Sequence, residues 1–282
     1  MTPPPLSAIM VEPSVRAALL EDLGRAGDLT TDAIVPASAR TETALMARQA
    51  GVVAGLDFAA AAFRLIDPAI EVLVERADGS RLAPGDLIAV IRGPARGILT
   101  AERTALNFLC HLSGIASATR GIVDAIAGTK AQVVCTRKTM PGLRAAQKYA
   151  VRVGGGQNQR LALWDGILIK ENHIAAAGSI AAALQAARAL DAGVGIQIEV
   201  ESLAELEQAL DAGAANVLID DFSLDDMRRA VALNAGRALL EVSGGVDLTV
   251  VRKIAATGVD RISIGKLTKD VRAVDLSMRV IG

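Results

Sequence analysis

The sequence has few of the residue types that build several common kinds of site. Aromatic residues make up 2% of the 282 residues, and there are two His and two Cys. So few aromatic rings argue against a stacking platform for single-stranded nucleic acid. Cys110 and Cys135 lie far apart and form neither a disulfide framework nor a zinc ribbon, and two His do not make a His-rich metal centre. A metal ion would therefore be held by oxygen ligands, as Mg²⁺ prefers.

An excess of charge of one sign and a long apolar run are also missing. Thirty basic and 31 acidic side chains give a net charge of −1, so no global basic field indicates a nucleic-acid partner. The longest uncharged apolar run, Ile174–Leu184, is too short to cross a bilayer. The opening MTPPPLSAIM lacks the basic and apolar blocks of a secretory signal. With so little cysteine, this predicts a soluble cytoplasmic protein without a membrane partner.

The first part of the chain predicts a small domain of mixed helices and strands. The expected elements are helices at Val11–Leu23 and Leu56–Ile66 and strands at Ala69–Glu75 and Leu87–Ile91. A long helix is expected to follow, capped by Thr100, running to about Ala127 and broken near Ser113 and Gly114.

From Ala131 onward, short apolar strands alternate with helices. The expected strands are Gln132–Thr136, Gly166–Lys170, Gly195–Val200, Asn216–Asp220, Ala238–Ser243 and Arg261–Gly265. Ser202 and Ser223 each stand three residues before an acidic residue, the spacing of a capping box that opens a helix. Repeated strand–helix units predict a parallel sheet with right-handed connections.

Side chains alternate between the two faces of a strand, and here the two faces differ in kind. In the strand that ends at Val200, Ile198 and Val200 share one face, whereas Gln197 and Glu199 share the other. Most of the other strands repeat this division, with a β-branched face and a face that becomes polar toward the carboxyl end. This favours a barrel with a site at its C-terminal mouth over an open doubly wound sheet. The alternative is a set of solvated strand ends.

Positive charge is concentrated in one part of the chain. Seven cations fall within 34 residues: Arg137, Lys138, Arg144, Lys148, Arg152, Arg160 and Lys170. This concentration implies a substrate with several negative charges. A solvated helical face is the simpler interpretation for Lys148 and Arg152, but not for Arg137 and Lys170, which end buried strands. The run Gly154–Gly156 is either a loop or a backbone cradle for phosphate.

Acidic and glycine-rich residues follow the later strands. Glu199 and Asp220 end adjacent strand–helix units and could hold Mg²⁺ with waters and substrate oxygens, or pair with Lys170 or Arg137, or do both in turn. Glu201, Asp221 and Glu241 complete this acidic set. The turns Ser243-Gly244-Gly245 and Ser263-Ile264-Gly265 favour phosphate binding over plain turns, because barrels often bind phosphate after their last strands.

Several motifs together resemble the quinolinate phosphoribosyltransferase family (nicotinate-nucleotide pyrophosphorylase, carboxylating). They are Cys135-Thr136-Arg137-Lys138-Thr139-Met140-Pro141-Gly142-Leu143-Arg144, Gly154-Gly155-Gly156-Gln157-Asn158-Gln159-Arg160, Leu168-Ile169-Lys170-Glu171-Asn172-His173 and Glu102-Arg103-Thr104-Ala105-Leu106-Asn107. The resemblance covers nearly the whole chain. It implies that quinolinate and phosphoribosyl pyrophosphate (PRPP) give nicotinate mononucleotide, pyrophosphate and CO₂ with Mg²⁺.

The resemblance also implies a fold and an assembly. The fold is α/β: an N-terminal α/β sandwich domain with leading helices (1–113), an incomplete, open α/β barrel that carries the catalysis (114–268), and a C-terminal segment (269–282) that packs back on the first domain. The assembly is a homodimer in which Arg103 reaches the partner's site.

The resemblance also implies which residues bind each ligand. The resemblance assigns quinolinate to Arg103, Thr136, Arg137, Lys138, Gln159, Arg160 and Lys170. It assigns the phosphate of PRPP to Ser243, Gly244, Gly245, Ser263, Ile264 and Gly265, and Lys266 is expected to add a cation beside the second of these turns. The catalytic set is Lys138, Lys170, Glu199 and Asp220, of which Glu199 and Asp220 hold the metal.

The expected chemistry needs no covalent nucleophile, so the two histidines have other expected roles. Decarboxylation uses the pyridinium nitrogen as an electron sink, and bidentate Arg suits a pair of carboxylates. We expect His173 to orient its loop and His111 to be an interface or core residue.

Three positions depart from the family pattern. Gln159 stands where His is usual, Lys266 where Ala is common, and Asp221 where Asn is common. Gln can donate a hydrogen bond to a carboxylate but cannot become cationic. The hypothesis is that Gln159 weakens quinolinate binding or decarboxylation and that Lys266 offsets part of this, through phosphate or by pairing with Asp221.

Two other functions remain open at this point. Gln159 suggests a barrel that binds pyridine carboxylates or nucleotides without turnover, or one that acts on another pyridine acid such as nicotinate. The metal carboxylates Glu199 and Asp220 favour an enzyme, and three arginines favour a ligand with two carboxylates.

Overall fold

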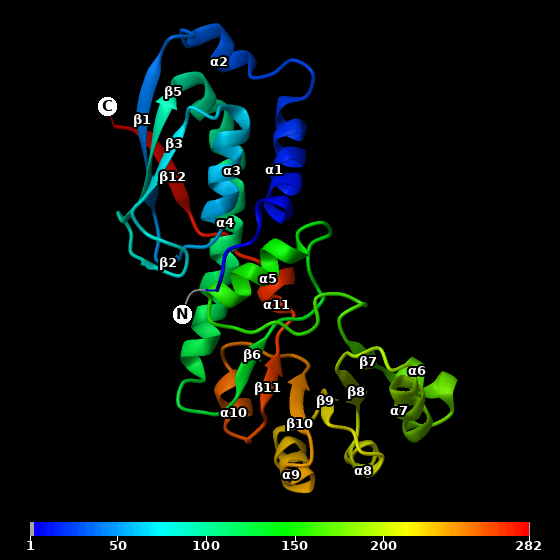
Figure 1. Cartoon of the computed structure of the whole chain (residues 1–282). Helices are drawn as coiled ribbons and strands as arrows, with labels where there is room; N and C mark the ends of the chain where they lie inside the picture. Colours follow the sequence, from blue (N-terminus) through cyan, green and yellow to red (C-terminus); the bar gives the residue numbers. More distant parts are fainter. Residues whose placement is uncertain (1–2, 282) are drawn as a thin grey trace. The chain divides into compact units, whose positions relative to one another are not determined.

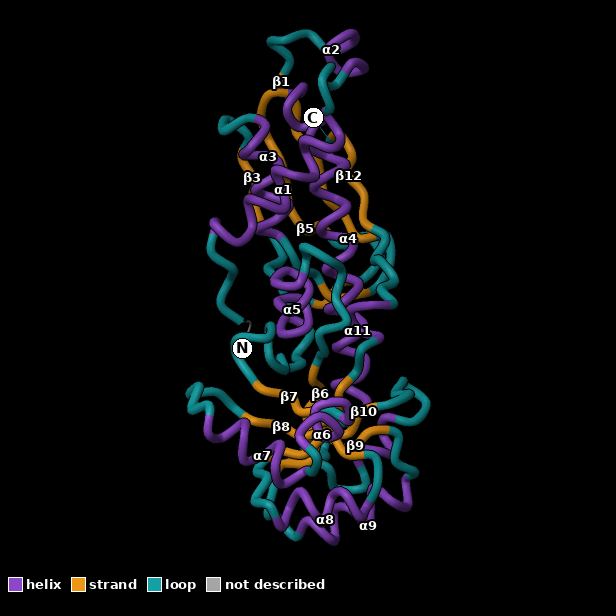
Figure 2. Tube along the Cα trace, turned by 90° about the vertical axis from the view of Figure 1, so that its right-hand side faces the viewer, coloured by secondary structure: helices purple, strands orange, loops and turns teal. Residues whose placement is uncertain are grey.

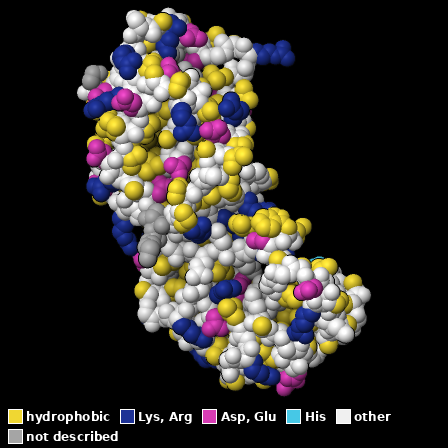
Figure 3. Space-filling model, viewed as in Figure 1, with side chains coloured by type: hydrophobic (Ala, Val, Ile, Leu, Met, Phe, Trp, Pro, Cys, Tyr) yellow, Lys and Arg dark blue, Asp and Glu magenta, His cyan; other side chains and the backbone are white. Residues whose placement is uncertain are grey.

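The computed structural model describes residues 3–281 and forms two compact units. The first contains the described residues of Met1–Arg120, Met140–Gly155 and Asp270–Gly282, and the second contains Gly121–Thr139 and Gly156–Lys269. Figure 1 shows the elements of both units. No helix of the described residues is long and apolar enough to span a membrane. On the face shown in Figure 3, acidic and basic side chains are interspersed, in keeping with the net charge of −1.

The first unit is built on a four-stranded antiparallel sheet in the order β12-β1-β5-β3. Its strands are β1 (Arg40–Ala47), β3 (Glu71–Val74), β5 (Leu87–Pro94) and β12 (Leu276–Val280), and a small second sheet pairs β2 (Gly51–Val52) with β4 (Arg81–Leu82). Its helices are α1 (Ala8–Leu23), α2 (Leu29–Ile34), α3 (Leu56–Ile66), most of α4 (Ala95–Ala125) and α5 (Arg144–Val153). The rings of Phe58 on α3 and Phe108 on α4 stack with centroids 5.3 Å apart. The expected helix Leu56–Ile66 is confirmed.

The long helix α4 differs from its prediction. It begins at Ala95 and continues without a break past Ser113 and Gly114 to Ala125. These two small residues do not end the helix; they allow other segments of the chain to pack closely against it. Ser113 Oγ accepts a hydrogen bond from the backbone N–H of Ala54 at 3.0 Å. A Cβ on Gly114 would lie 2.3 Å from the carbonyl oxygen of Arg272, so only glycine lets that backbone pass.

Gly114→Ala is expected to lower the free energy of unfolding by about 2 kcal/mol or more, because the added methyl collides with backbone. Gly121→Ala is the matched control on the same helix, where nothing lies within 4 Å of the added Cβ. The control should gain about 0.5–1 kcal/mol from helix propensity. Urea unfolding of both variants measures the difference, and equal stabilisation by the two changes would contradict the close contact.

Lys148 on α5 also departs from its prediction. The sequence predicts a solvated helical face, but the side chain is 1% exposed, with Gln147 and Tyr149 buried beside it. Tyr149 Oη donates to Asp78 Oδ2 at 2.8 Å, and burial, together with this carboxylate, raises the pKa of Tyr149 above its ordinary value. The α5 helix is thus a buried part of the first unit.

The second unit is a parallel α/β sheet of six strands in the order β6-β11-β10-β9-β8-β7. The strands are β6 (Gln132–Val134), β7 (Ile167–Ile169), β8 (Ile196–Val200), β9 (Asn216–Asp220), β10 (Leu239–Ser243) and β11 (Arg261–Ser263). The helices are α6 (Glu171–Ala177), α7 (Ile180–Ala189), α8 (Leu203–Asp211), α9 (Leu224–Asn234), α10 (Val251–Ala255) and α11 (Lys266–Lys269). Figure 2 shows α7, α8 and α9 on the outer side of the strands. The strands stand where the sequence predicts them, several of them shorter at their ends.

The predicted helix caps of this unit are confirmed. Ser202 Oγ accepts from the backbone N–H of Glu205 at 3.2 Å, and Ser223 Oγ accepts from that of Asp226 at 3.1 Å. Each bond satisfies one of the donors that the first turn of a helix leaves unpaired. These caps begin α8 and α9 directly after strands β8 and β9.

The sheet is an incomplete barrel, and the loop at residues 156–166 lies between its two edge strands. Gln157 forms a parallel bridge with Val134 of β6. Arg160 donates from Nη1 to the carbonyl oxygen of Gly166 at 2.9 Å, next to the start of β7. The loop thus pairs with one edge strand, leads directly into the other and carries Gln159 and Arg160 between them.

The predicted division of the strand faces is confirmed. Apolar residues of one face are buried beneath the helices: Ile198, Val200, Val217, Ile219, Leu240, Val242, Ile262 and Ile264. Residues of the other face line cavities at the carboxyl ends of the strands. Because the strands are parallel, all these ends meet at one edge, as the barrel interpretation requires.

Candidate active site

Two adjoining cavities lie at the carboxyl ends of the strands of the second unit. The glycine-loop cavity, of about 330 Å³, is lined by Thr136, Lys138, Lys170, Glu199, Asp220, Asp221, Ser243, Gly244, Gly245, Val246, Ser263, Ile264, Gly265, Lys266 and Lys269. The arginine cavity, of about 280 Å³, is lined by Thr136, Arg137, Lys138, Gln159, Arg160, Leu168, Lys170, Glu199, Leu218, Ser243 and Ser263. The two cavities share a wall of residues that includes Lys138, Lys170 and Glu199.

The arginine cavity brings two guanidinium groups beside an apolar surface. Burial, and after it the charge of Arg137, lowers the pKa of Arg160 below its ordinary value. Nε of Arg137 is buried without a hydrogen-bond partner. Leu168 and Leu218 supply the apolar part of the lining. Two cations that repel one another next to an apolar wall make a suitable site for a flat, multiply charged anion.

Lys170 and Glu199 form an ion pair in the wall that both cavities share. Lys170 Nζ lies 2.9 Å and 3.0 Å from the two carboxylate oxygens of Glu199. The Glu199 side chain is 8% exposed and that of Lys170 is 45% exposed. Of the two predicted states for Glu199, this is the salt-bridged one.

His173 has the structural role that the sequence predicts. Its Nδ1 accepts a hydrogen bond from the backbone N–H of Lys170 at 3.0 Å and so closes the first turn of α6. The bond fixes the backbone from which the Lys170 side chain extends. His111 lies in the first unit, with Nε2 2.9 Å from Nε2 of Gln147, and burial lowers its pKa.

The metal-ligating capacity of the site rests on two carboxylates. Among the described residues, no group of three or more His, Cys, Asp and Glu side chains could hold a metal ion. Glu199 and Asp220 both line the glycine-loop cavity. Two carboxylate donors beside an anion cavity fit Mg²⁺, which keeps several waters and completes its shell with substrate phosphate oxygens.

The glycine turns place backbone close to this cavity. Gly244 and Gly245 have φ of +100° and +56°, and a Cβ on Gly244 would lie 1.9 Å from Oδ1 of Asp221. A Cβ on Gly265 would lie 2.9 Å from Cδ of Lys138. Glycine is therefore required for the close approach at Gly244, and the exposed backbone N–H groups of such turns suit phosphate.

Lys266 lines the glycine-loop cavity, but the expected ion pair with Asp221 is not formed within residues 3–281. The carboxylate of Asp221 lies against Gly244 instead. Hydrogen bonds from Thr249, and to a smaller extent the charge of Lys266, lower the pKa of Asp247. Lys266 thus adds positive charge to the cavity without pairing with Asp221.

Glu241 forms a buried polar network that the sequence does not predict. The sequence pattern groups it with the acidic residues at the mouth, but its side chain is 0% exposed. Glu241 accepts hydrogen bonds from Ser263 Oγ, from Gln159 Nε2 at 3.0 Å and from Gln197 Nε2 at 3.1 Å. Gln159 Nε2 also donates to Gln197 Oε1 at 2.8 Å. The strand pattern puts Gln197, Glu241 and Ser263 on one face, but the contact with Gln159 depends on a loop.

This network changes the expected role of Gln159. An amide has two N–H bonds on one nitrogen, and here that nitrogen donates to Glu241 and to Gln197. A ligand carboxylate could receive a hydrogen bond from Gln159 only if one of these bonds were given up. Gln159 therefore lines the arginine cavity while its donors face the barrel interior.

The structure brings together every predicted site residue of the second unit. Arg103, the one predicted site residue of the first unit, is an exposed residue of α4 and does not line either cavity.

Comparison with known proteins supports the family resemblance of the sequence motifs. Residues 28–113 match the model of the quinolinate phosphoribosyl transferase N-terminal domain, and residues 115–279 match that of the C-terminal domain. The chain belongs to this family. Within the family, it is 44% identical to a nicotinate-nucleotide pyrophosphorylase [carboxylating] of Mycobacterium leprae over 273 residues, with 94% of this chain and 95% of the relative covered.

Solved structures of family members share the fold. NadC from Streptococcus pyogenes superimposes with a TM-score of 0.95 at 40% identity and covers 99% of this chain and 100% of its own. The nicotinate-nucleotide pyrophosphorylase of Francisella tularensis gives a TM-score of 0.95 at 41% identity, with 98% of each chain covered. The family fold of an N-terminal sheet domain and an incomplete barrel is thereby confirmed for this chain.

Proposed function

We propose that this protein transfers the phosphoribosyl group of PRPP to quinolinate with loss of CO₂, giving nicotinate mononucleotide and pyrophosphate in NAD biosynthesis. The observation that carries the proposal is the pair of adjoining cavities, one lined by arginines and an apolar wall and one lined by glycine turns and carboxylates. The reaction has two anionic substrates that must meet, and the two cavities share a wall. The names of the family relatives support the same reaction.

Quinolinate would occupy the arginine cavity. Arg137 and Arg160 suit its two adjacent carboxylates, since a planar guanidinium binds a carboxylate through two parallel hydrogen bonds. Leu168 and Leu218 would contact the ring. Thr136, Lys138, Gln159 and Lys170 line the same cavity and belong to the proposed quinolinate set.

PRPP would occupy the glycine-loop cavity. Its 5′-phosphate would lie on the turns Ser243-Gly244-Gly245 and Ser263-Ile264-Gly265, with Lys266 adding positive charge. Glu199 and Asp220 would hold Mg²⁺, which when bound neutralises charge on the leaving pyrophosphate. Lys138 and Lys170 would orient the pyrophosphate from the shared wall and stabilise the charge that develops on it.

The arrangement needs no covalent intermediate. The pyridine nitrogen of quinolinate forms the new bond to ribose as the bond to pyrophosphate breaks, and the ring becomes a pyridinium. Loss of CO₂ then leaves an electron pair on the ring carbon next to the pyridinium nitrogen, whose positive charge stabilises it. A proton adds to this carbon in place of the lost carboxyl group. The described residues of the barrel would hold the two substrates in position, and such positioning lowers the barrier to their reaction.

A homodimer and a cytoplasmic location belong to the same proposal. Arg103 is exposed on α4, and we place it in the quinolinate site of the partner subunit. The sequence has two cysteines, and such scarcity is typical of proteins in a reducing compartment.

The proposed reaction is tested with protein, Mg²⁺, PRPP and either quinolinate or nicotinate. We expect nicotinate mononucleotide and equimolar pyrophosphate from quinolinate, and a kcat/KM for nicotinate lower by about a hundredfold or more, because one carboxylate leaves a guanidinium without its partner. Binding of quinolinate without any product would favour the alternative of a non-catalytic barrel, which the family relatives do not favour.

Gln159→His is expected to raise kcat/KM for quinolinate about tenfold. An imidazole can donate one N–H to Glu241 and the other to a ligand carboxylate, whereas the amide nitrogen of Gln159 already donates to Glu241 and Gln197. Steady-state kinetics measures the change, with the KM for PRPP as an internal control that should not move. Absence of any gain would overturn the hypothesis that Gln159 weakens quinolinate use.

A further inference from the structure

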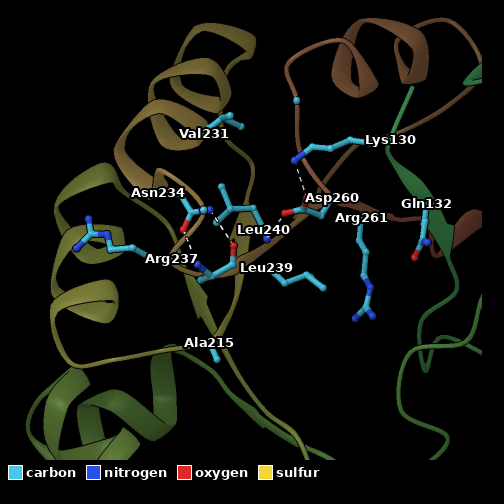
Figure 4. Close-up of a pocket in the computed structure, with 13 residues that line it drawn as sticks. Lys130, Gln132, Ala215, Val231, Asn234, Arg237, Leu239, Leu240, Asp260 and Arg261 are labelled. Atoms are coloured by element: carbon cyan, nitrogen blue, oxygen red, sulfur yellow. Dashed lines mark hydrogen bonds and ion pairs between the residues drawn. The ribbon is translucent and has the colours of Figure 1, made fainter. Parts of the chain in front are cut away.

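A larger cavity lies at the opposite ends of the same strands. It has a volume of about 530 Å³, and Figure 4 shows the residues around it. Gln132, Leu239 and Arg261, the first residues of β6, β10 and β11, form part of its lining. None of its lining residues belongs to the glycine-loop or arginine cavity. We call it the amino-end cavity, because parallel strands that end together also begin together.

Arg261 is a cation without a counter-ion in this cavity. Its side chain extends from the start of β11 into the space near Gln132 and Leu239 (Figure 4). Its Nε is buried and has no hydrogen-bond partner. Within residues 3–281, no carboxylate forms an ion pair with Arg261.

Two acidic residues lie near Arg261, Asp260 in the sequence and Glu241 in the sheet, and the carboxylates of both already accept hydrogen bonds from other groups. Asp260 Oδ1 accepts from Lys130 Nζ at 2.7 Å, and Asp260 Oδ2 accepts from the backbone N–H of Leu240 at 2.9 Å. Glu241 is aligned with Arg261 in the sheet, but its oxygens accept from the side chains of the buried network. Neither carboxylate therefore forms an ion pair or a hydrogen bond with the guanidinium of Arg261.

The other two cations of the lining are neutralised. Lys130 pairs with Asp260, and Arg237 Nη1 lies 3.2 Å from Asp211 Oδ1. Arg261 is therefore the one cation of this lining that forms no ion pair with the described residues. Leaving a partly buried guanidinium without a hydrogen-bond acceptor has a cost that a bound oxyanion would remove.

We propose that the amino-end cavity binds a small oxyanion, a carboxylate or a phosphate, through Arg261. The guanidinium offers a planar fork of donors that fits both groups. The amide of Gln132 lies beside it and can add a further donor (Figure 4). The cavity volume is in the range of small-molecule sites. This ligand is distinct from the two substrates, whose proposed sites lie at the other ends of the strands.

The proposal is tested by crystallography with selenate, an oxyanion that anomalous scattering locates. We expect a selenium peak within hydrogen-bonding distance of Arg261 in the wild-type protein. The peak should vanish in Arg261→Gln, which is shorter and uncharged. Arg237→Gln is the matched control, because it removes the same charge from the same cavity but from a residue that Asp211 already neutralises. The control should keep the peak.

A solution measurement separates a real site from binding at crystal concentration only. Calorimetric titration with inorganic phosphate should fit one binding site fewer, or an association constant lower by about tenfold or more, in Arg261→Gln than in the wild type and Arg237→Gln. Selenate found only at the carboxyl ends of the strands, a peak near Arg261 that survives Arg261→Gln, or identical titrations of all three proteins would each overturn the proposal. None of these readouts depends on the proposed reaction.

Discussion

Lys170→Met is expected to lower kcat/KM for the proposed reaction by about a hundredfold to a thousandfold. Lys170 is in the wall between the two cavities and is the cation held by both oxygens of Glu199. The variant keeps the length of the side chain but removes the charge that would stabilise the leaving pyrophosphate and bind a quinolinate carboxylate. Loss of one preorganised charge in an active site commonly costs about 3–4 kcal/mol of transition-state stabilisation.

Two controls separate this effect from damage to the fold. Lys253→Met removes a charge from an exposed helical position of the same unit and should leave kcat/KM unchanged. Lys170→Met also leaves the Glu199 carboxylate without its cation, so the double variant with Glu199→Gln should recover thermal stability without recovering activity. Activity within about tenfold of the wild type in Lys170→Met would contradict the proposed role.

Glu241→Gln is expected to lower the free energy of unfolding by about 2–4 kcal/mol. The carboxylate of Glu241 is fully buried and accepts from Ser263, Gln159 and Gln197. An amide in its place has only one accepting oxygen and turns an N–H group toward donors, so at least one buried hydrogen bond is lost. Because Gln159 and Ser263 line the arginine cavity, the KM for quinolinate should rise as well.

Urea unfolding and steady-state kinetics measure the two effects of Glu241→Gln. Glu207→Gln is the control, an equal chemical change at an exposed position of α8, and should alter the free energy of unfolding by less than about 0.5 kcal/mol. An equal free energy of unfolding for Glu241→Gln and this control would contradict the claim that the hydrogen bonds of Glu241 stabilise the fold.

The sequence predicts the barrel well because the patterns that specify each strand and helix lie within that element. Most strands of the second unit have a period of two that separates an apolar from a polar face. The helices after β8 and β9 begin at the serine caps Ser202 and Ser223. Parallel strands necessarily bring their carboxyl ends together, so the strand pattern by itself places Glu199 and Asp220 in one site. The same reasoning brings Lys170 to the same edge, where it pairs with Glu199.

The features that sequence patterns miss depend on contacts between distant segments. Gly114 is expected to break a helix, and only the approach of the Arg272 carbonyl shows why glycine is there. Lys148 is expected in solvent, because a cation is seldom buried and its surroundings cannot be read locally. The network of Glu241 needs a loop residue, Gln159, more than 80 positions away in the chain.

The unpaired guanidinium of Arg261 is another such feature. A pattern of alternating residues places Arg261 on the inner face of its strand, but it does not show which carboxylates are already engaged. In the folded chain, Asp260 is engaged by Lys130 and by a backbone N–H, and Asp211 is engaged by Arg237. Charge balance within a cavity is thus a property of the folded chain.

The central claim is that the two cavities join quinolinate to the phosphoribosyl group and release one carboxyl group. The most direct measurement uses quinolinate labelled in the carboxyl group next to the ring nitrogen, with PRPP and Mg²⁺, and follows labelled CO₂, pyrophosphate and nicotinate mononucleotide together. The account predicts that the three products appear in equal amounts and that none appears when PRPP is omitted. Labelled CO₂ without nicotinate mononucleotide, or no product with both substrates present, would contradict it.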